Sequence, residues 1–344
     1  MMKTLITLIK DCINIRKMEG IMPDQNRHIA DFMLGEDITG FYVLRRADLK
    51  TRRDNKGYFL AIDISDASGH IAGNVWDHAE KVAETVHSGD VVKIKAQVQS
   101  YQGQKQLSVQ RLRPAGSADD IDMSELVPAV STDVEKLWQQ YKEFAENIVN
   151  PFLKSLLRKF IEDEAFQTAF CETPGGKMWH HGYRGGLLEH TIGVTKICEK
   201  LSPLYPETDR DVLLAAALLH DIGKINSYQH GPTFEYTDEG RLLGHIVIGS
   251  QMIVEKINKI PAFPSELSNK LQHLVLSHQG KLEQASPVVP MMAEAFILYY
   301  ADEIDSKLNA FYRIKHREHK EGIKWSSYVR LLGQFFYFGE KTKS

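Results

Sequence analysis

The stretch that most constrains this chain is LLAAALLHDIGK, residues 213–224, in which an apolar run ends in a histidine and an aspartate. Seven apolar residues in succession fit a helix that is buried on every side. Burying His220 and Asp221 at the end of that helix costs free energy unless a partner compensates them. A divalent metal ion would do so, since imidazole nitrogen and carboxylate oxygen suit manganese, iron, zinc or magnesium. A buried His–Asp hydrogen bond is the alternative, and an isolated pair favours that alternative.

Further polar residues interrupt apolar helical segments in the C-terminal half of the chain. They are His190 after GGLLE, His245 in LLGHIVIG, His278 in LVLSHQGK and Asp302 in FILYYADEID. Taken singly, each is more simply a satisfied core group or a surface residue. Together with the His-Asp pair they offer four imidazoles and two carboxylates from five predicted helices. A helical bundle can build a two-metal site in this way, with one or two ligands from each helix.

Length and composition describe an ordinary globular protein. The 344 residues suffice for two domains, with 43% hydrophobic and 25% charged residues. A net charge of -3 gives no overall attraction to nucleic acid, so such binding would need a local basic patch. The three cysteines include no CxxC pair, which argues against a disulfide framework and favours a cytoplasmic location.

Changes in pattern along the chain predict its organisation. We expect an N-terminal extension over 1–22, whose short apolar run is broken by Lys10 and Asp11 and cannot span a membrane. The segments that follow are an OB-fold domain at 23–113, a linker at 114–130, a helical domain at 131–324 and a C-terminal tail at 325–344. The predicted architecture is therefore an all-β barrel followed by an all-α bundle.

Five strand-like segments lie between residues 38 and 112, with a short helical stretch at 77–86 between the third and the fourth. That order is typical of an OB-fold barrel. The first loop, predicted at 45–57, holds six cations against Asp48 and Asp54, a local charge of 6 - 2 = +4. The cations are Arg45, Arg46, Lys50, Arg52, Arg53 and Lys56, and the flanking strands carry Phe41, Tyr42, Tyr58, Phe59 and Trp76. Cations and flat rings together fit single-stranded nucleic acid. In the alternative interpretation the rings fill the barrel core and the charges form a solvated hairpin.

After the linker the sequence predicts helices. Their approximate ranges are 132–149, 151–170, a helix beginning near 187, 209–220, 243–258, 265–277 and 289–308. The tail is aromatic at Phe335, Phe336 and Tyr337, so we expect it to pack on the bundle or on a second subunit of a homo-oligomer.

The order His190, His220-Asp221, Asp302 resembles the HD-domain metal-dependent phosphohydrolases, and His245 and His278 match the extra histidines of their binuclear members. HDIGK, YTDEGRLLGHI, LSHQGKLEQASP and ILYYADEIDSKLN, preceded by an OB-fold, are similar to the YhaM-type 3'-5' exoribonucleases. The resemblance spans roughly residues 23–312. One departure is Gln279, which stands where that family tends to have a second histidine.

The resemblance implies two divalent ions, manganese first, with iron, cobalt, magnesium, zinc or nickel as alternatives. Asp221 would bridge the ions; His190, His220 and Asp302 would complete one site, and His245 and His278 the other. Two such ions can activate a water at neutral pH and offset charge on a phosphate. Lys224, just past Asp221, is a candidate for binding the scissile phosphate, or it simply complements a helix C-terminus.

Further candidate substrate contacts are His180, His181 and Arg184, in a glycine-rich turn before the His190 helix, and Lys281. A turn of this kind entering a helix favours anions. Ordinary solvent exposure is an equal interpretation for all four.

The function that this resemblance implies is metal-dependent 3'-5' exonucleolytic hydrolysis of single-stranded RNA to nucleoside monophosphates, with single-stranded DNA as a further possible substrate. One alternative is a small-nucleotide phosphohydrolase, which would have no need of the OB-fold. Another is a non-catalytic single-stranded DNA-binding protein, which would have no need of so many buried polar residues.

Overall fold

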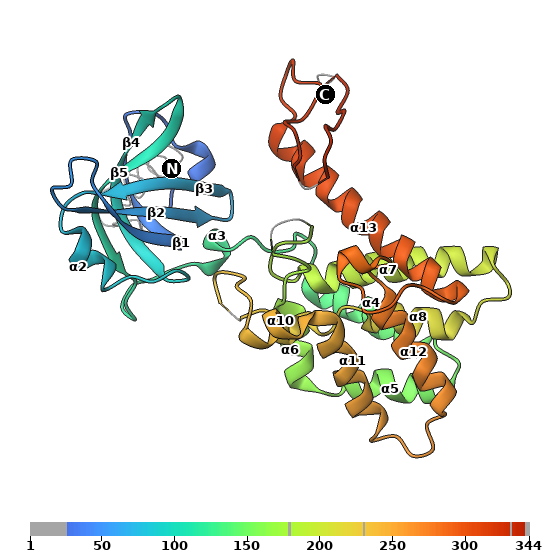
Figure 1. The fold of residues 1–344 in the computed structure, drawn as a ribbon. Coiled ribbons are helices and arrows are strands. Elements are labelled where there is room, and N and C mark those ends of the chain that lie inside the picture. The colour runs from blue at the N-terminus through green and yellow to red at the C-terminus, as the bar shows by residue number, and fades with distance from the viewer. Residues whose placement is uncertain (1–25, 178–179, 230, 331, 341–344) are drawn as a thin grey trace, which may run out of the picture. The chain divides into compact units, whose positions relative to one another are not determined.

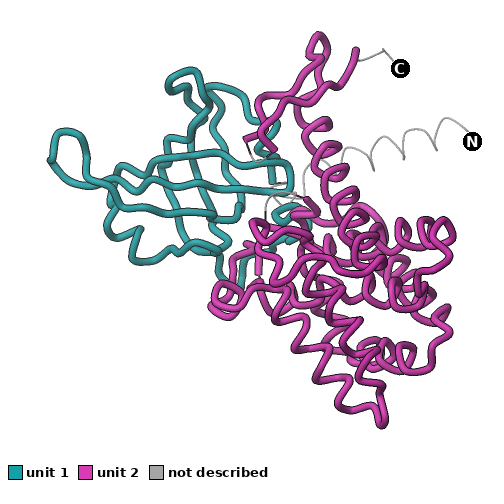
Figure 2. Tube along the Cα trace, turned by 45° about the vertical axis from the view of Figure 1, so that its right-hand side comes forward, with its two compact units in different colours: residues 1–127 teal, residues 128–344 magenta. Residues whose placement is uncertain are grey.

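A computed structural model describes residues 26–177, 180–229, 231–330 and 332–340. The chain divides into two compact units, residues 1–127 and 128–344 (Figure 2). The division falls within the predicted linker, and the predicted extension over 1–22 lies outside the described residues. Among the described helices, none has the length and apolar character that crossing a membrane requires.

The first unit is a five-stranded closed barrel. Its strands are β1 (Asp37–Thr51), β2 (Tyr58–Asp66), β3 (Gly69–Val75), β4 (Val91–Tyr101) and β5 (Gln104–Pro114), with helix α2 (Ala79–Ala83) between β3 and β4 (Figure 1). The order around the barrel is β1-β2-β3-β5-β4, and only β3 and β5 pair in parallel. Alternating residues such as Leu60, Ile62 and Ile64 fill the interior. The predicted OB-fold order is confirmed.

The strand before the basic loop is longer than the sequence suggested. β1 continues to Thr51 and pairs with Tyr58, so the loop spans only residues 52–57 instead of the predicted 45–57. Arg45 and Arg46 therefore belong to the strand, where a change of register next to Leu44 marks a bulge. Charged residues on an outward-facing edge do not end a strand as long as the partner strand supplies hydrogen bonds.

Two adjacent aromatic residues of β1 divide between the core and the surface. Tyr42 is fully buried, and its hydroxyl donates a hydrogen bond to the carbonyl oxygen of Arg27 at 2.8 Å. Phe41 lies on the other face, with the ammonium group of Lys93 4.9 Å from the ring centre. The alternation of side chains along a strand imposes this division.

The second unit is helical. The short helix α3 (Met123–Leu126) precedes it, at the end of the first unit. The helices of the second unit are α4 (Val134–Glu146), α5 (Pro151–Ile161), α6 (Glu164–Glu172), α7 (Gly186–Leu201), α8 (Arg210–Leu219), α9 (Lys224–Ser227), α10 (Asp238–Leu242), α11 (Gly244–Ile257), α12 (Ser265–Ser277) and α13 (Ala293–Glu318). α8 contacts α7, α12 and α13, and every residue from 212 to 219 is fully buried. The prediction of a helix buried on all sides is confirmed.

Three helical expectations need correction. The predicted helix over 151–170 is two helices, because Asp163 caps a new helix by accepting a hydrogen bond from the backbone amide of Phe166. The linker contains the short helix α3, and α13 begins at Ala293 and runs ten residues past the predicted end at 308. The tail packs on this extension, where Phe336 and Phe338 form a cluster with Ile314.

Candidate metal centre

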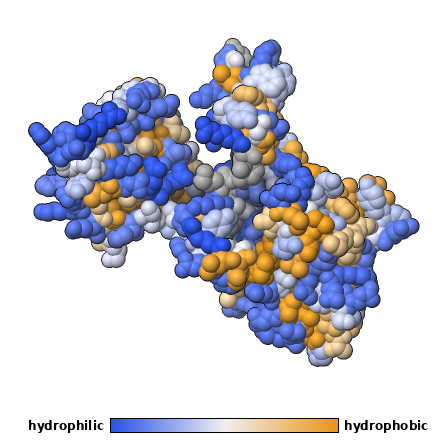
Figure 3. All heavy atoms as spheres, viewed as in Figure 1, coloured by the Kyte–Doolittle hydropathy of each residue, from blue (hydrophilic) through white to orange (hydrophobic). Residues whose placement is uncertain are grey.

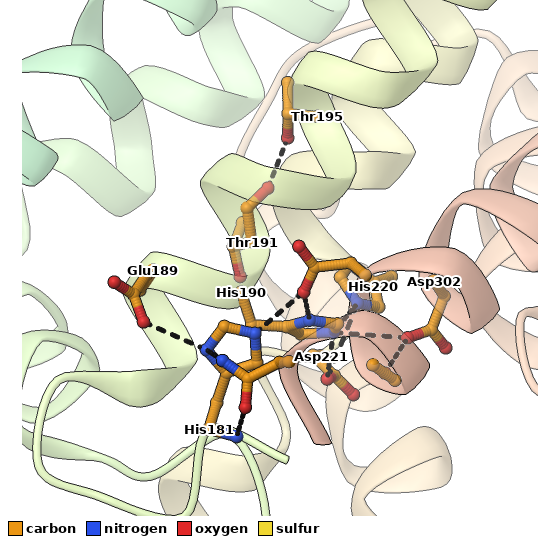
Figure 4. Close-up of polar contacts among 12 residues, drawn as sticks. His181, Glu189, His190, Thr191, Thr195, His220, Asp221 and Asp302 are labelled. Atoms are coloured by element: carbon orange, nitrogen blue, oxygen red, sulfur yellow. Dashed lines mark hydrogen bonds and ion pairs between the residues drawn. The ribbon is translucent and has the colours of Figure 1, made fainter. Parts of the chain in front are cut away.

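The six residues expected to hold metal converge at the C-terminal end of α8. His190 lies in α7, His220 caps α8 and is followed by Asp221, His245 lies in α11, His278 caps α12, and Asp302 lies in α13. The residues lie up to 112 positions apart in the sequence, and Figure 4 shows four of them facing one another.

The carboxylate of Asp221 lies between two groups of histidines. Its Oδ2 is 3.5 Å from Nε2 of His190 and 3.4 Å from Nε2 of His220. Its Oδ1 is 3.3 Å from Nε2 of His245 and 3.5 Å from Nε2 of His278. One oxygen thus faces each pair of imidazoles, which is the arrangement of a bridging ligand.

The remaining carboxylate closes one of these groups. Oδ1 of Asp302 lies 3.2 Å from Nε2 of His190 and accepts a hydrogen bond from the hydroxyl of Ser306 at 3.1 Å. Nε2 of His190 is in turn 3.3 Å from Nε2 of His220. Three side chains from three helices therefore direct their donor atoms at one point.

Hydrogen bonds on the outer side of the rings fix which nitrogen faces the centre. Nδ1 of His220 donates to the carbonyl oxygen of Ala217 at 2.8 Å, and Nδ1 of His278 donates to that of Val275 at 2.7 Å. Because a carbonyl only accepts, these Nδ1 atoms carry hydrogen. The Nε2 lone pairs are thereby available to a metal ion.

The donor set fits divalent ions, and two buried atoms lack any other partner. Oδ1 of Asp221 and Nε2 of His245 are inaccessible to solvent and have no hydrogen bond. Such atoms are uncommon in a folded protein and call for an explanation. Two groups of donor atoms, one of His190, His220 and Asp221 and the other of Asp221, His245 and His278, are each compact enough to hold an ion.

The ionisation of these groups is strongly perturbed. Burial favours the neutral ring of His190, but hydrogen bonds to Asp221, Asp302 and Asp305 outweigh it and raise its pKa well above the usual value. For His278, the Asp221 carboxylate likewise outweighs burial and raises the pKa. Burial opposes ionisation of Asp221, but the charge of Lys224 and the histidines lowers its pKa well below normal. His245 differs, because burial prevails and lowers its pKa.

Lys224, the other predicted catalytic residue, is a buried part of the centre. Its ammonium group lies 2.5 Å from Oδ2 of Asp221 and also donates to the carbonyl oxygen of Gly175. It therefore joins the HD motif to the glycine-rich turn over 175–186. An ammonium group beside a bridging carboxylate is well placed to neutralise a phosphate oxygen.

Sequence reasoning missed Asp305, which lies one turn after Asp302 on α13. Its Oδ2 accepts a hydrogen bond from Nδ1 of His190 at 2.7 Å and lies 2.8 Å from Nε2 of His181. Because Asp305 orients a candidate metal ligand, it belongs to the site although it faces away from the centre. The signal in the sequence was its spacing of three from Asp302, which puts both carboxylates on one helix face.

His181, predicted as a substrate contact, is buried and contacts other side chains of the site. It is only 4% exposed, and its Nδ1 lies 3.1 Å from the carboxylate of Glu189 (Figure 4). Asn309 accepts a hydrogen bond from its backbone amide at 2.8 Å. With both ring nitrogens engaged by carboxylates, His181 fits a role in holding Asp305.

The other predicted substrate contacts are dispersed. The ring centre of His180 lies 5.5 Å from that of His190, with the two rings tilted at 47°, and its buried Nδ1 has no hydrogen-bond partner. Burial and nearby charges lower the pKa of His180 to about 3, so this ring is neutral. Arg184 is exposed and pairs with Glu172, and Lys281 is exposed three residues after His278. Of these three, His180 is the one that the structure brings to the metal centre.

Gln279 lies next to the candidate ligand His278. Its side-chain amide nitrogen is 3.3 Å from Nε2 of that ring. This contact engages Nε2, the same nitrogen of His278 that a metal ion would use. Metal binding therefore requires this weak contact to open.

The barrel carries a separate candidate interface for nucleic acid. Phe59 of β2 and Trp76 after β3 stack with ring centres 4.9 Å apart, and Trp76 is 42% exposed. The guanidinium of Arg52 lies 5.6 Å from the centre of the Trp76 ring. Arg46, Arg53 and Lys56 are exposed on β1 and the loop, and Arg45 is partly buried. This grouping of rings and cations suits single-stranded nucleic acid.

Comparison with known proteins defines the class. An HD domain matches residues 187–307 and an OB-fold nucleic acid binding domain matches residues 45–115, so the protein joins an OB-fold to an HD domain. The chain is 32% identical to the 3'-5' exoribonuclease YhaM of Halalkalibacterium halodurans over 303 residues, which cover 87% of this chain and 93% of that protein. It is 30% identical to the protein of the same name from Bacillus licheniformis, covering 84% and 92%. The chain belongs to the YhaM 3'-5' exoribonuclease family.

Solved structures of OB-fold domains are similar to part of this chain. The second OB-fold domain of replication protein A from Methanococcus maripaludis is 20% identical, with a TM-score of 0.23, and covers 28% of this chain and all of that domain.

Proposed function

We propose that this protein is a metal-dependent 3'-5' exoribonuclease that hydrolyses phosphodiester bonds of single-stranded RNA and releases nucleoside monophosphates. The observation that carries the proposal is the place of Asp221, whose two oxygens face two separate pairs of histidines. Membership of the YhaM family supports the polarity and the substrate.

The six side chains would hold two divalent ions, with manganese as the first expectation. Asp221 would be shared; His190, His220 and Asp302 would complete one site, and His245 and His278 the other. Bound ions of this kind supply an activated water and offset the charge that builds on a phosphate. The buried rings and Asp305 hold the donors at fixed positions, which reduces reorganisation when substrate arrives.

Other side chains act directly on the substrate. Lys224 is expected to neutralise an oxygen of the scissile phosphate, since its ammonium group lies in the same buried centre. His180, with its neutral ring and unpartnered Nδ1, is a candidate hydrogen-bond partner for the terminal ribose or phosphate. Of the six candidate metal ligands, His245 has the most exposed side chain, at 26%, so we expect substrate to enter on its side.

The OB-fold would bind the upstream part of the strand. The stack of Phe59 and Trp76 offers a face for bases, and Arg45, Arg46, Arg52, Arg53 and Lys56 offer charges for phosphates. Both contacts are tolerant of sequence, as an enzyme that degrades RNA of any sequence requires. Neither contact distinguishes ribose from deoxyribose, so single-stranded DNA is a substrate to test beside RNA.

The experiment that tests the function combines metal analysis with a 5'-labelled RNA ladder. Wild-type protein should bind close to two ions per chain and shorten the labelled RNA stepwise from its 3' end. Asp221→Ala should lose both properties, whereas Glu143→Ala, at an exposed position of α4, should keep them. RNA that is bound but never shortened by metal-loaded wild type would identify a non-catalytic binding protein. Hydrolysis restricted to mononucleotides would identify a small-nucleotide hydrolase.

A homo-oligomer and a cytoplasmic location stay predictions. Figure 3 shows apolar residues gathered on parts of the surface of the helical unit, and Leu242 and Met291 are 82% and 71% exposed. Light scattering on the purified full chain measures the oligomeric state directly.

A further inference from the structure

Two stacked tyrosines lie in the hairpin that follows the HD motif. The ring centres of Tyr228 and Tyr236 are 4.9 Å apart, with 28° between the ring planes. Tyr228 is 6% exposed, whereas Tyr236 is 37% exposed. A backbone bridge between the same two residues fixes the hairpin. The buried ring therefore supports a partly exposed one, and Tyr236 offers a flat aromatic surface at a defined position.

Two cations flank the exposed ring. The ammonium group of Lys177, from the glycine-rich turn, lies 5.9 Å from the centre of the Tyr236 ring, and the guanidinium of Arg241, from α10, lies 6.0 Å from it. The carboxylate of Glu235 approaches both, at 2.6 Å from Lys177 and 4.0 Å from Arg241. All three charged side chains are at least one-third exposed, so water and salt screen these pairs. An anion can replace Glu235 there at small cost.

The tyrosine pair adjoins the metal centre. Lys224 contacts Asp221 in that centre and donates to the carbonyl oxygen of Gly175, two residues before Lys177. Tyr228 caps α9, the short helix that begins at Lys224. Burial raises the pKa of the Tyr228 phenol, with smaller contributions from Tyr236 and from the charge of Asp221. The glycine-rich turn and the hairpin are thus both anchored on the HD motif.

We propose that Tyr236, Lys177 and Arg241 form a binding site for a nucleotide that adjoins the scissile bond. The base stacks on the Tyr236 ring, and the neighbouring phosphate displaces Glu235 from the two cations. Aromatic rings with nearby cations bind single-stranded nucleic acid in this way, and Lys and Arg make charge-assisted hydrogen bonds to phosphate. The inference rests on the proposed exoribonuclease function and assigns its substrate contacts.

The first test separates substrate binding from chemistry. Tyr236→Ala should raise KM for single-stranded RNA about tenfold, since loss of one base stack weakens binding by that order. Its kcat and metal content should match wild type, and Tyr236→Phe should retain the wild-type KM. Tyr205→Ala is the matched control, because Tyr205 is 54% exposed in the same unit but outside this hairpin. An unchanged KM in Tyr236→Ala would overturn the proposal, as would a KM in Tyr205→Ala raised to the same degree.

The second test asks whether the ring contacts a base. RNAs are prepared with an abasic nucleotide on either side of the 3'-terminal phosphodiester bond. For wild type, one of the two substrates should show a KM raised about tenfold, and Tyr236→Ala should show no further loss on that substrate. If Tyr236→Ala loses the same factor on all three RNAs, the ring acts on the fold and the proposal fails.

The third test uses charge changes of opposite sign. Lys177→Gln and Arg241→Gln should each reduce the slope of log KM against log salt by about 0.7, the value for one phosphate contact on a single strand. Glu235→Gln should lower KM at low salt, because the competing carboxylate is gone. A raised KM in Glu235→Gln would show that the ion pairs merely hold the loop and would overturn the proposal.

These outcomes are separable from those of the proposed function. If wild type fails to degrade RNA, the function itself is wrong. If wild type degrades RNA while the Tyr236, Lys177 and Arg241 variants match it, only the nucleotide site is wrong.

Discussion

Asp305 and His190 form a hydrogen bond of 2.7 Å between Oδ2 and Nδ1, from α13 to α7. The bond fixes the ring of His190 so that Nε2 faces Asp221 and Asp302. The same oxygen lies 2.8 Å from Nε2 of His181. A single carboxylate behind the centre therefore sets the orientation of one candidate ligand and is itself held by a buried histidine.

The first prediction concerns this carboxylate. Asp305→Asn should weaken metal binding by about 10–100-fold, because an amide is a poorer acceptor for the hydrogen bond from His190. Glu303→Gln is the control, since Glu303 lies two residues before Asp305 on the same helix and pairs with Lys307, four residues after Glu303. Metal titration of both variants measures the effect, with melting temperatures to check folding. Equal metal affinity in Asp305→Asn and wild type would show that Asp305 does not position His190.

Metal binding should strengthen as pH rises. The pKa values of His190 and His278 are raised. In metal-free protein these rings therefore keep a second proton at pH values above the usual histidine pKa, near 6.5. A metal ion must displace that proton from Nε2. The affinity should therefore be weakest in acid and increase until both rings have lost the proton. Titrations at pH 6, 7 and 8 check this, and an affinity independent of pH would contradict it.

The same shifts predict how metal changes stability. A raised histidine pKa contributes stability that is fully present below the unfolded value and is lost as pH rises through the folded value. Metal-free protein should therefore lose this contribution on the alkaline side, where bound metal adds the most. We expect the rise in Tm on adding manganese to be larger at pH 8 than at pH 6. A larger rise at pH 6 would exclude these histidines as the proton-linked ligands.

The candidate metal ligands could be proposed from the sequence because each lies within or directly at the end of an apolar helical segment. A buried helix ending in His220 and Asp221 needs compensation, and no property of packing explains polar residues at His190, His278 and Asp302. Local pattern indicated that these positions are buried, since hydrophobic periodicity indicates which face of a helix is buried. The resemblance to HD-domain phosphohydrolases then implied that they form one ligand set.

The surrounding residues could not be found in this way. Asp305 stands out in the sequence only by its spacing from Asp302, and His181 was predicted as a substrate contact. Tertiary structure brings α13 and the turn before α7 together and thereby places these two residues in contact. His181 also has a positive φ of 44°, which no sequence pattern announces. The extent of β1 was missed because hydrogen bonds to β2 override a basic composition. Tyr236 and Lys177 lie 59 positions apart, so their proximity depends on tertiary structure.

The aromatic stack on the barrel should contribute directly to RNA affinity. Trp76→Ala should weaken binding of single-stranded RNA by about 1–3 kcal/mol, because one base loses its stacking surface. Tyr101→Ala serves as the control, since this residue is 53% exposed at the far end of β4. Fluorescence anisotropy with labelled RNA and inactive Asp221→Ala protein measures binding without cleavage. Equal affinities for the Trp76 variant and its control would remove this stack from the interface.

Gly223 of HDIGK allows two helices to approach closely. A Cβ at this position would overlap the carbonyl oxygen of His245 and the amide nitrogen of Gly249, both backbone atoms of α11. Since a backbone cannot yield as a side chain does, Gly223→Ala should push α11 away and move His245 from Asp221. We expect a loss of about 2 kcal/mol or more in the free energy of unfolding.

The expected consequence for the centre is specific. In Gly223→Ala the ion that His245 and His278 would hold should be lost first, so metal content should fall from about two to about one per chain. Gly231→Ala is the matched control, because a Cβ there meets nothing within 4 Å. Metal analysis and denaturant unfolding of both variants check the prediction. A Gly223→Ala protein with full metal content and wild-type stability would mean that α11 can shift without cost, and His245 would then not be a required ligand.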